Sequence, residues 1–273
     1  MVAIILAAGY ATRLYPINLN TPKALLEIGG KTMLDHIVDK IGGIGDIART
    51  VIVSNDKFYD CFIEWKDKRR AAGKNNDIGK NCKSICKYIC NANNQELIIL
   101  NDGTTSEQTR RGAIGDIQFV IETLSLDDEA IIIAGDNFFT FQLADLYNFY
   151  RQVGADCISV KKIADRGALN HLGVAVLGPG NRVLDFEEKP HNPKSDFAVY
   201  ATYIYRRDTM PLFKVYLDEG NPKDAPGNFP AWLCKKKHVA AYIFDGECYD
   251  VGTPEAYYNV CEKYGIVAHD EHG

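Results

Sequence analysis

Hydrophobic and polar residues follow one another along the chain in blocks that predict strands and helices in turn. Val2 to Ala7 is a continuous aliphatic run that ends at Gly9, which is typical of a strand buried on both faces of a parallel sheet. Thr32 then begins a Thr-x-x-Asp capping pattern, and apolar residues follow at helical spacing until Gly42. Further strands are predicted at Thr50 to Ser54, Glu96 to Leu100 and Ala130 to Ala134, and further helices at Phe58 to Arg70, Ala113 to Thr123 and Leu143 to Val153. This alternation predicts βαβ units.

Asp156 to Val160 is predicted as the next strand of this series, and the pattern changes after it, where the strand candidates become shorter and lie closer together. They are Val174 to Leu177, Arg182 to Phe186, Ala198 to Tyr205 and Val239 to Phe244. Such spacing favours mixed or antiparallel pairing. Thr253-Pro254 predicts the cap of a last helix, because proline is well tolerated at the first helical position. We therefore expect an α/β fold: a Rossmann-like, three-layer αβα domain with a mostly parallel mixed central sheet and a smaller antiparallel lobe.

The segment from Gly73 to Asn94 interrupts this order and reads as an insertion, with six Asn and four Lys in its 22 residues. Its apolar residues recur at helical spacing: Cys82, Ile85, Cys86, Ile89 and Cys90. Cysteines eight residues apart on a straight helix are separated by about 12 Å, too far to share one zinc ion. We therefore expect a short amphipathic helix that packs its cysteines against the body of the protein.

Composition limits the classes of partner. With 273 residues, 46% of them hydrophobic and 25% charged, the chain fits one large domain or two closely packed lobes. A net charge of −5 disfavours nucleic acid as a partner. The longest apolar runs are far shorter than the roughly 20 residues that span a bilayer, so no membrane partner is expected. No basic segment precedes the first apolar run, and we expect a cytoplasmic protein whose eight cysteines are free thiols.

The stretch after the first predicted strand carries the strongest chemical signal. It reads Leu-Ala-Ala-Gly-Tyr-Ala-Thr-Arg-Leu from Leu6 to Leu14, and Thr21-Pro22-Lys23 follows. A turn rich in Gly and Ala at the carboxyl end of a buried strand lets backbone N–H groups approach an anion. Neither a Walker loop nor a G-x-G-x-x-G motif fits here, which removes the usual support for kinase-like and dehydrogenase functions. Arg13 and Lys23 carry positive charges that suit neighbouring phosphates of a triphosphate.

These residues resemble the signature of the sugar-1-phosphate nucleotidylyltransferases, which reads L-A-x-G-x-[GA]-T-R-L-x-P followed by P-K-x-L-L. Further blocks stand in that family's order: Gly135-Asp136-Asn137, Gly173-Val174, Phe186 to Pro190 and Tyr249 to Pro254. The resemblance covers residues 1 to about 260 and is nearest to stand-alone glucose-1-phosphate thymidylyltransferases and uridylyltransferases. It implies an enzyme that condenses a nucleoside triphosphate, with dTTP or UTP favoured, and a hexose 1-phosphate into a nucleotide sugar and pyrophosphate.

Two carboxylates follow strand candidates at positions suited to magnesium. Asp136 comes just after the Ala130 to Ala134 strand, which places it at the same sheet edge as the Arg13 loop. Asp250 ends a strand just before the Gly-Thr-Pro start of the last helix. Magnesium is commonly held by one or two carboxylates together with substrate phosphates. We therefore expect Mg²⁺ as the cofactor, held by Asp136 and Asp250.

The resemblance also assigns roles to other positions. For catalysis it implies Arg13, Lys23 and Lys189. For the nucleotide it implies Leu6, Ala8, Gly9, Ala11, Thr12, Asp102, Gly103 and Gly112. For the sugar phosphate it implies Gly173, Glu188, Lys189 and Thr202. Ala11 stands where many members have glycine, so its methyl group is harmless at negative φ and costly at positive φ.

We expect residues 1–265 to form one nucleotidyltransferase domain followed by a tail, 266–273. Residues 1–154 would form its nucleotide-binding half, with the insertion 73–94, and residues 155–265 its sugar-phosphate-binding half. Two alternatives stay open: a CTP-dependent cytidylyltransferase of a small molecule such as phosphocholine, and a GT-A-type glycosyltransferase. The second usually has Asp-x-Asp where this chain has Asp136-Asn137-Phe138. The number of subunits is also open, with a homo-oligomer as one option.

Overall fold

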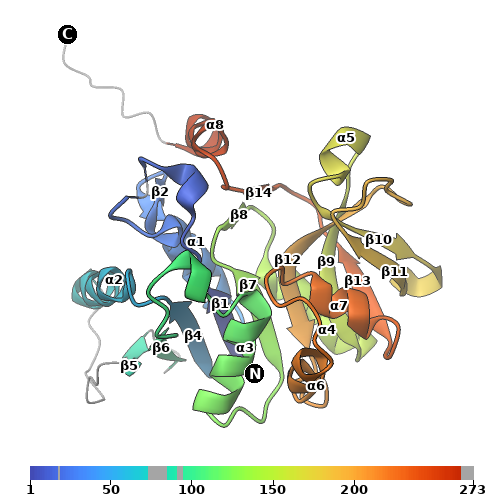
Figure 1. The fold of residues 1–273 in the computed structure, drawn as a ribbon, viewed down its shortest axis with the longest axis horizontal. Helices are drawn as coiled ribbons and strands as arrows, with labels where there is room; N and C mark the ends of the chain where they lie inside the picture. The colour runs from blue at the N-terminus through green and yellow to red at the C-terminus, as the bar shows by residue number, and fades with distance from the viewer. Residues whose placement is uncertain (18, 73–84, 91–94, 266–273) are drawn as a thin grey trace.

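Strands from both halves of the chain form one sheet through the middle of the molecule (Figure 1). The computed structural model describes residues 1–17, 19–72, 85–90 and 95–265. Eight strands of the described sheet lie in the order β11 (Val183–Glu188), β10 (Gly173–Leu177), β12 (Phe197–Tyr205), β7 (Ala130–Ala134), β1 (Val2–Leu6), β4 (Arg49–Ser54), β6 (Gln95–Asn101) and β5 (Ile85–Cys90). Beside β12 lies β9 (Asp156–Lys162), which pairs with β13 (Val239–Ile243). Strands β7, β1, β4 and β6 run parallel, as expected.

The aliphatic run at the start of the chain is the centre of this sheet. Strand β1 pairs with β4 on one side and with β7 on the other. Ala3, Ile4 and Ile5 are fully buried, because helices cover both faces of the strand. A strand in this position has no polar face, which explains why its sequence does not alternate.

Helices cover the two faces of the sheet and complete three layers (Figure 1). One face packs against α1 (Met33–Ile41), α2 (Tyr59–Ala72) and α4 (Leu143–Val153). The other packs against α3 (Ala113–Thr123), α6 (Leu212–Asp218) and α7 (Asn228–Leu233). A third apolar cluster joins α8 (Pro254–Tyr264) to β2 (Glu27–Ile28) and β8 (Asn137–Phe139). Smaller elements are β3 (Lys31–Thr32), α5 (Arg166–Leu169) and β14 (Cys248–Asp250). The predicted α/β fold is confirmed.

The helix ends follow the signals in the sequence. Thr32 and Asp35 form a capping box at the start of α1. The side chain of Thr253 accepts a hydrogen bond from Ala256 N at 3.2 Å at the start of α8. Gly154 ends α4 with φ 62°, a left-handed conformation that costs glycine little. None of the described helices is both long enough and apolar enough to cross a bilayer.

The expected helix in the insertion is wrong. Ile85–Cys90 is strand β5, which pairs antiparallel with β6 so that Ile85 lies opposite Leu100. Strand β6 already pairs with β4 and would otherwise leave an open edge. A partner strand satisfies that edge, and this tertiary pairing overrides the local helical spacing. Cys82, which was expected in the same helix, lies outside the described residues.

The antiparallel strands of the second half continue the central sheet. β12 pairs antiparallel with β7, and β10 pairs antiparallel with both β12 and β11. Thr202 lies opposite Ile133 of β7, and Val199 lies opposite Gly173 of β10. Because β12 runs against β7, this end of β10 lies beyond the carboxyl end of β7. The two halves therefore share one sheet edge, where the predicted site residues gather.

Candidate active site

A buried lysine joins two carboxylates at the carboxyl edge of the parallel strands. Asp136 follows β7, and Asp250 ends β14, where it lies opposite Asn137 of β8. Lys23 Nζ lies 2.9 Å from Asp136 Oδ2 and 3.0 Å from Asp250 Oδ1. The structure thus brings together three predicted site residues, although the aspartates are 113 and 227 positions from the lysine in sequence.

The charges in this cluster determine the protonation state of Lys23. Burial of Lys23 would by itself lower its pKa, because removal from water disfavours an ammonium group. The negative charges of Asp136 and Asp250, with their hydrogen bonds to Nζ, outweigh burial and raise the pKa of Lys23. The lysine is therefore a cation throughout the neutral range. The Asp136 and Asp250 side chains are 44% and 56% exposed and remain accessible to a ligand.

The two carboxylates fit the ligand chemistry of magnesium. Mg²⁺ prefers oxygen ligands, and one or two carboxylates with substrate phosphates are a common ligand set. Asp136 and Asp250 supply such oxygens close together and partly exposed. Among the described residues, no group of three or more His, Cys, Asp or Glu side chains could hold a metal ion. A cation at this site would therefore need further oxygen ligands, from water or from substrate phosphates, to complete its coordination.

The loop after β1 is fixed by backbone contacts at its start. Leu6 O accepts a hydrogen bond from Gly135 N at 2.9 Å, and Ala8 O accepts one from Asn55 Nδ2 at 2.9 Å. Gly9 is exposed, and a Cβ atom there would have no neighbour within 4 Å among the described residues. The anchored start and the open Gly9 leave backbone accessible at the place predicted for phosphates.

Ala11 adopts the costly conformation that the sequence left undecided. Its φ is 47° and its ψ 40°, a left-handed conformation that disfavours a side chain by roughly 1 kcal/mol. Leu14 N donates to Ala11 O at 3.0 Å and closes the 3-10 turn Thr12–Leu14. Arg13 is exposed on this turn, and Thr12 Oγ1 lies 3.5 Å from Glu107 Oε2. The strained residue thus starts the turn that presents Arg13.

The loop after β6 turns its acidic residue inward. Asp102 is buried, and its Oδ1 accepts hydrogen bonds from Thr104 N at 2.7 Å and Thr104 Oγ1 at 2.8 Å. Gly103 follows with φ 77°, which glycine adopts readily. Arg111 Nε donates to Asp102 O at 2.9 Å and ties the end of the loop to its beginning. Any contact of Asp102 with a nucleotide would therefore be through its backbone.

Gly112 lies where two backbones meet closely. Its φ is 79°, and a Cβ atom there would lie 2.7 Å from Lys223 O and 2.9 Å from Asp224 Oδ1. Ile114 N donates to Lys223 O at 2.9 Å, so the first turn of α3 docks on the segment between α6 and α7. Glycine is required here for close packing as well as for its positive φ.

On the other side of the site, two glycines make room for a carboxylate. Gly173 lies opposite Glu188 in the β10–β11 pair. A Cβ atom on Gly173 would lie 3.1 Å from Glu188 Oε2, and one on Gly227 would overlap with that oxygen. Burial raises the pKa of Glu188, and the charge of Lys189 partly opposes that rise. The glycines leave Glu188 space that side chains would occupy.

Lys189 and Thr202 occupy contrasting positions beside this carboxylate. Lys189 is exposed with φ 49°, and its backbone N donates to Leu172 O at 3.1 Å. Thr202 is fully buried on β12, and within the described residues its Oγ1 has no hydrogen-bond partner. A buried hydroxyl without a partner is uncommon in folded proteins, and burial keeps this one out of contact with solvent.

The sequence model of the nucleotidyl transferase family matches residues 2–266, almost the whole chain. The chain belongs to the nucleotidyl transferase family. Its solved relatives share the fold: UDP-glucose pyrophosphorylase complexed with UDP-glucose superposes with a TM-score of 0.72 at 20% identity, covering 96% of this chain and 97% of that one.

Two curated relatives match this chain over most of its length. UTP–glucose-1-phosphate uridylyltransferase of Escherichia coli K12 is 26% identical over 282 residues, which cover 97% of this chain and 92% of the relative. Glucose-1-phosphate adenylyltransferase of Geobacter metallireducens is 26% identical over 283 residues, which cover 94% and 64%. The chain spans only 52% to 64% of the length of several relatives that it matches, the Geobacter enzyme among them.

Sequence reasoning missed two residues of this candidate site. Asn55 holds Ala8 O with its Nδ2, and its Oδ1 accepts a hydrogen bond from Phe58 N at 3.0 Å. Its place directly after the predicted strand ending at Ser54 was the available signal. Gly227 adjoins Glu188 but lies 39 positions away, and only the fold shows this contact. The direct contact of Lys23 with both aspartates was also not foreseen.

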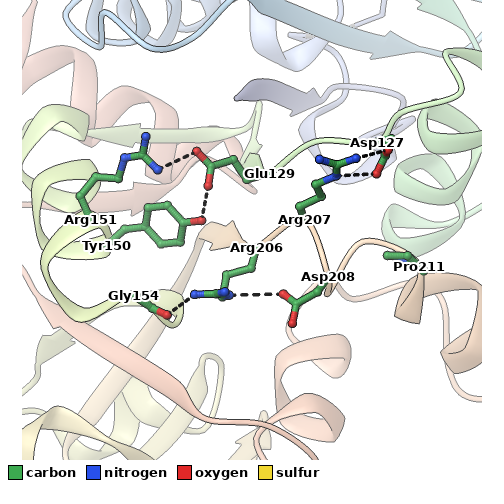
Figure 2. Close-up of a pocket in the computed structure, with 9 residues that line it drawn as sticks. All are labelled: Asp127, Glu129, Tyr150, Arg151, Gly154, Arg206, Arg207, Asp208 and Pro211. Carbon is green, nitrogen blue, oxygen red and sulfur yellow. Dashed lines mark hydrogen bonds and ion pairs between the residues drawn. The ribbon is translucent and has the colours of Figure 1, made fainter.

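A separate pocket of about 610 Å³ lies at the opposite edge of the sheet (Figure 2). Glu129 precedes β7, and Arg206 follows β12, whose last residue lies opposite the first of β7. The pocket is lined by Asp127, Glu129, Tyr150, Arg151, Gly154, Arg206, Arg207, Asp208 and Pro211. Its arginines are paired: Arg151 with Glu129, Arg206 with Asp208 and Arg207 with Asp127. Because these arginines are already paired with carboxylates, the pocket offers less free positive charge for phosphates than the exposed Arg13 and Lys189 at the other edge.

Proposed function

We propose that the protein condenses a nucleoside triphosphate with a hexose 1-phosphate to give a nucleotide sugar and pyrophosphate. The observation that carries this proposal is the contact of Lys23 with Asp136 and Asp250 at one sheet edge. The relatives support the substrate class, because their names specify transfer to glucose 1-phosphate from UTP or of an adenylyl group. The relatives use different nucleobases, so they do not select one for this protein. We favour dTTP or UTP because of the sequence resemblance alone.

The proposed reaction needs positioned charge rather than a covalent intermediate. A phosphate oxygen of the sugar 1-phosphate attacks the α-phosphorus of the triphosphate. The new P–O bond forms as the bond from the α-phosphorus to the bridging oxygen breaks, and the electron pair leaves with pyrophosphate. Reactions of this kind are accelerated mainly by in-line positioning and by charge stabilisation.

The side chains divide this work by their positions. Arg13, exposed on the turn after β1, would bind the departing pyrophosphate with its guanidinium fork. Lys189 would bind the phosphate of the attacking sugar, and Glu188 would accept hydrogen bonds from sugar hydroxyls. Lys23 would stabilise charge near the α-phosphate while it holds the two aspartates in place.

Asp136 and Asp250 are the residues that would hold Mg²⁺. Bound there, the ion would supply positive charge beside the triphosphate. The backbone around Ala8 and Gly9 would receive the phosphates, and the loop 102–112 would receive the base. Gly103 and Gly112, both at positive φ, allow that loop to turn closely around a ligand.

Pyrophosphate release tests this function directly. Five triphosphates (ATP, CTP, GTP, UTP and dTTP) are each combined with several hexose 1-phosphates, with Mg²⁺ or with EDTA. We expect release from dTTP or UTP with a hexose 1-phosphate, and only when Mg²⁺ is present. The substitutions Asp136→Asn and Lys189→Ala should each reduce kcat/KM by roughly 100-fold or more, because each removes a protein charge that would stabilise the reacting phosphates or the metal ion.

Matched controls come from an exposed ion pair away from the site. Lys214 and Asp218 pair on α6 at 2.9 Å, so Asp218→Asn and Lys214→Ala remove the same charges without touching the cluster. Both controls should keep the activity of the parent. Full activity in Asp136→Asn and Lys189→Ala would disprove the assignment, and release from CTP with phosphocholine alone would favour the cytidylyltransferase alternative.

A further inference from the structure

A ring of hydrogen bonds joins the loops that follow β1, β4 and β6. Asn55 Nδ2 donates to Ala8 O at 2.9 Å, and the next residue, Asp56, donates from its backbone N to Thr104 O at 2.9 Å. Tyr10 OH donates to Thr104 Oγ1 at 3.4 Å and returns the ring to the loop after β1. We call these five residues the loop ring. Tyr10 and Thr104 are 94 positions apart in sequence, so the fold alone brings them together.

The direction of the hydrogen bonds at Thr104 follows from its contact with Asp102. Thr104 Oγ1 lies 2.8 Å from Asp102 Oδ1 and 3.0 Å from Asp102 Oδ2, and it donates its one proton to this carboxylate. The same oxygen therefore accepts from Tyr10, whose phenol is a donor at neutral pH. All three residues are buried, so water competes little for these hydrogen bonds.

Tyr10 holds the loop after β1 beside its strained residue. It lies between Gly9, which is exposed, and Ala11, whose φ is 47°. A strained backbone conformation persists only where its surroundings hold it in place. Thr12 Oγ1 also joins the two loops, at 3.5 Å from Glu107 Oε2, but this contact is exposed and water competes with it. The buried Tyr10 side chain is therefore the firmer link.

We propose that Tyr10 is a positioning residue for the nucleotide: its hydroxyl holds the backbone at Gly9, which would receive the phosphates, in a fixed position relative to the loop 102–112, which would receive the base. This inference rests on the proposed function for its ligand, whereas the loop ring does not. Without the hydroxyl, the two loops move more independently, and a triphosphate must restrain them as it binds. Affinity for the triphosphate then falls, while the sugar-phosphate side, on β10 and β11, keeps its own contacts.

The two KM values test this role. In Tyr10→Phe we expect the KM for UTP or dTTP, whichever the parent uses, to rise roughly fivefold, because one buried hydrogen bond is lost. At a saturating concentration of that triphosphate, the KM for the hexose 1-phosphate should change by less than about twofold. A loss of stability alone would lower the amount of folded enzyme and therefore kcat, without raising the KM for the triphosphate. Tyr258→Phe removes an exposed hydroxyl on α8 and should behave as the parent protein.

Substitutions of Thr104 test the other end of the hydrogen bond. Thr104→Ser keeps the hydroxyl, and its KM for the triphosphate should stay within about twofold of the parent value. Thr104→Val removes the hydroxyl and also takes a donor from the buried Asp102, so this KM should rise by at least roughly tenfold. Adding Tyr10→Phe to Thr104→Val should cause no further rise, because the hydrogen bond is already absent. The exposed Thr123→Val on α3 is the matched control.

A second measurement needs no substrate. The urea midpoint of Tyr10→Phe should lie roughly 0.3 M below that of the parent protein, because a buried hydrogen bond is lost. In a protein that already carries Thr104→Val, Tyr10→Phe should lower the midpoint much less, since the partner hydroxyl is absent. The difference between these two effects measures the contact of Tyr10 with Thr104 itself.

The two measurements separate the possible failures. If the parent neither binds nor turns over a triphosphate, the proposed function fails, and the urea midpoints still test the contact. An equal fall of the midpoint on Tyr10→Phe with and without Thr104→Val would overturn the contact of Tyr10 with Thr104. An unchanged triphosphate KM in Tyr10→Phe would overturn the positioning role, and that test stands even if Thr104→Val does not fold.

Discussion

At the scale of single residues, Lys23 combines two tasks that are usually separate. Its Nζ pairs with both Asp136 and Asp250, and its burial fixes the position of that positive charge. A fixed charge is effective in catalysis because it does not reorganise as the reaction proceeds. Since the pKa of Lys23 is raised, its charge persists across the pH range in which the enzyme would work.

The substitution Lys23→Met tests this double role. We expect kcat/KM for pyrophosphate release to fall by roughly 100- to 1,000-fold, because a preorganised cation is lost. The thermal midpoint should change by only a few degrees, since both aspartates are about half exposed and regain water. Lys214→Met, in an exposed ion pair, is the matched control for both measurements. Activity within threefold of the parent in Lys23→Met would contradict the role.

Residue identities were predictable at this scale, but contacts were not. The motif blocks gave Lys23, Asp136 and Asp250 from the sequence, because phosphate and magnesium chemistry requires cations and carboxylates. Their direct contact depends on the β8–β14 pairing, which is two short strands and leaves little pattern. The burial of Asp102 depends likewise on how its loop folds back, with Arg111 Nε donating to Asp102 O.

At the scale of elements, the start of α1 links two helices. Thr32 Oγ1 accepts from Asp35 N at 3.0 Å, which makes the helix cap. Asp35 also accepts from Arg69 Nη1 at 2.7 Å and from Trp65 Nε1 at 3.1 Å, both on α2. The local signal Thr-x-x-Asp predicted the cap correctly. The link to α2 could not be predicted, because it depends on how both helices pack on the sheet.

The cap can be measured in isolation. Thr32→Ala removes the side-chain acceptor and should lower the free energy of unfolding by about 1 kcal/mol in urea denaturation. Thr32→Ser keeps the hydroxyl and should stay within about 0.5 kcal/mol of the parent. Pyrophosphate release should be unchanged in both. Equal stability of Thr32→Ala and the parent would show that the cap contributes nothing.

Strand β5 shows where element prediction fails. The spacing of its apolar residues indicated a helix, whereas the open edge of β6 required a strand. Short apolar runs do not distinguish the two structures by period alone. Longer, strongly periodic segments such as α3 and α4 were predicted with the bounds that the structure has.

At the scale of the whole molecule, the two halves of the chain share one sheet and the two apolar clusters that cover its faces. β12 from the second half pairs with β7 from the first, and both clusters contain residues from each half. The division at residue 154, expected from sequence, is therefore crossed by the sheet and by the apolar clusters and marks no boundary between folding units. The protein should unfold in one transition.

The two tryptophans report whether the halves unfold together, since Trp65 lies on α2 in the first half and Trp232 lies on α7 in the second. In Trp65→Phe the fluorescence follows the second half, and in Trp232→Phe the first. For each variant, the urea midpoint of the fluorescence should coincide with the urea midpoint that circular dichroism gives for the same variant. Midpoints separated by more than about 0.5 M would show that the halves unfold independently.

The segment 223–227 touches both sides of the site. Its Lys223 carbonyl receives the first turn of α3 beside Gly112, and its Gly227 adjoins the Glu188 carboxylate. A ligand that orders the loop 102–112 or the region of Glu188 therefore also restrains the segment 223–227, which contacts both. The second ligand then loses less conformational entropy when it binds. We expect synergy between the two substrates, and thermodynamic linkage requires it to be equal in both directions.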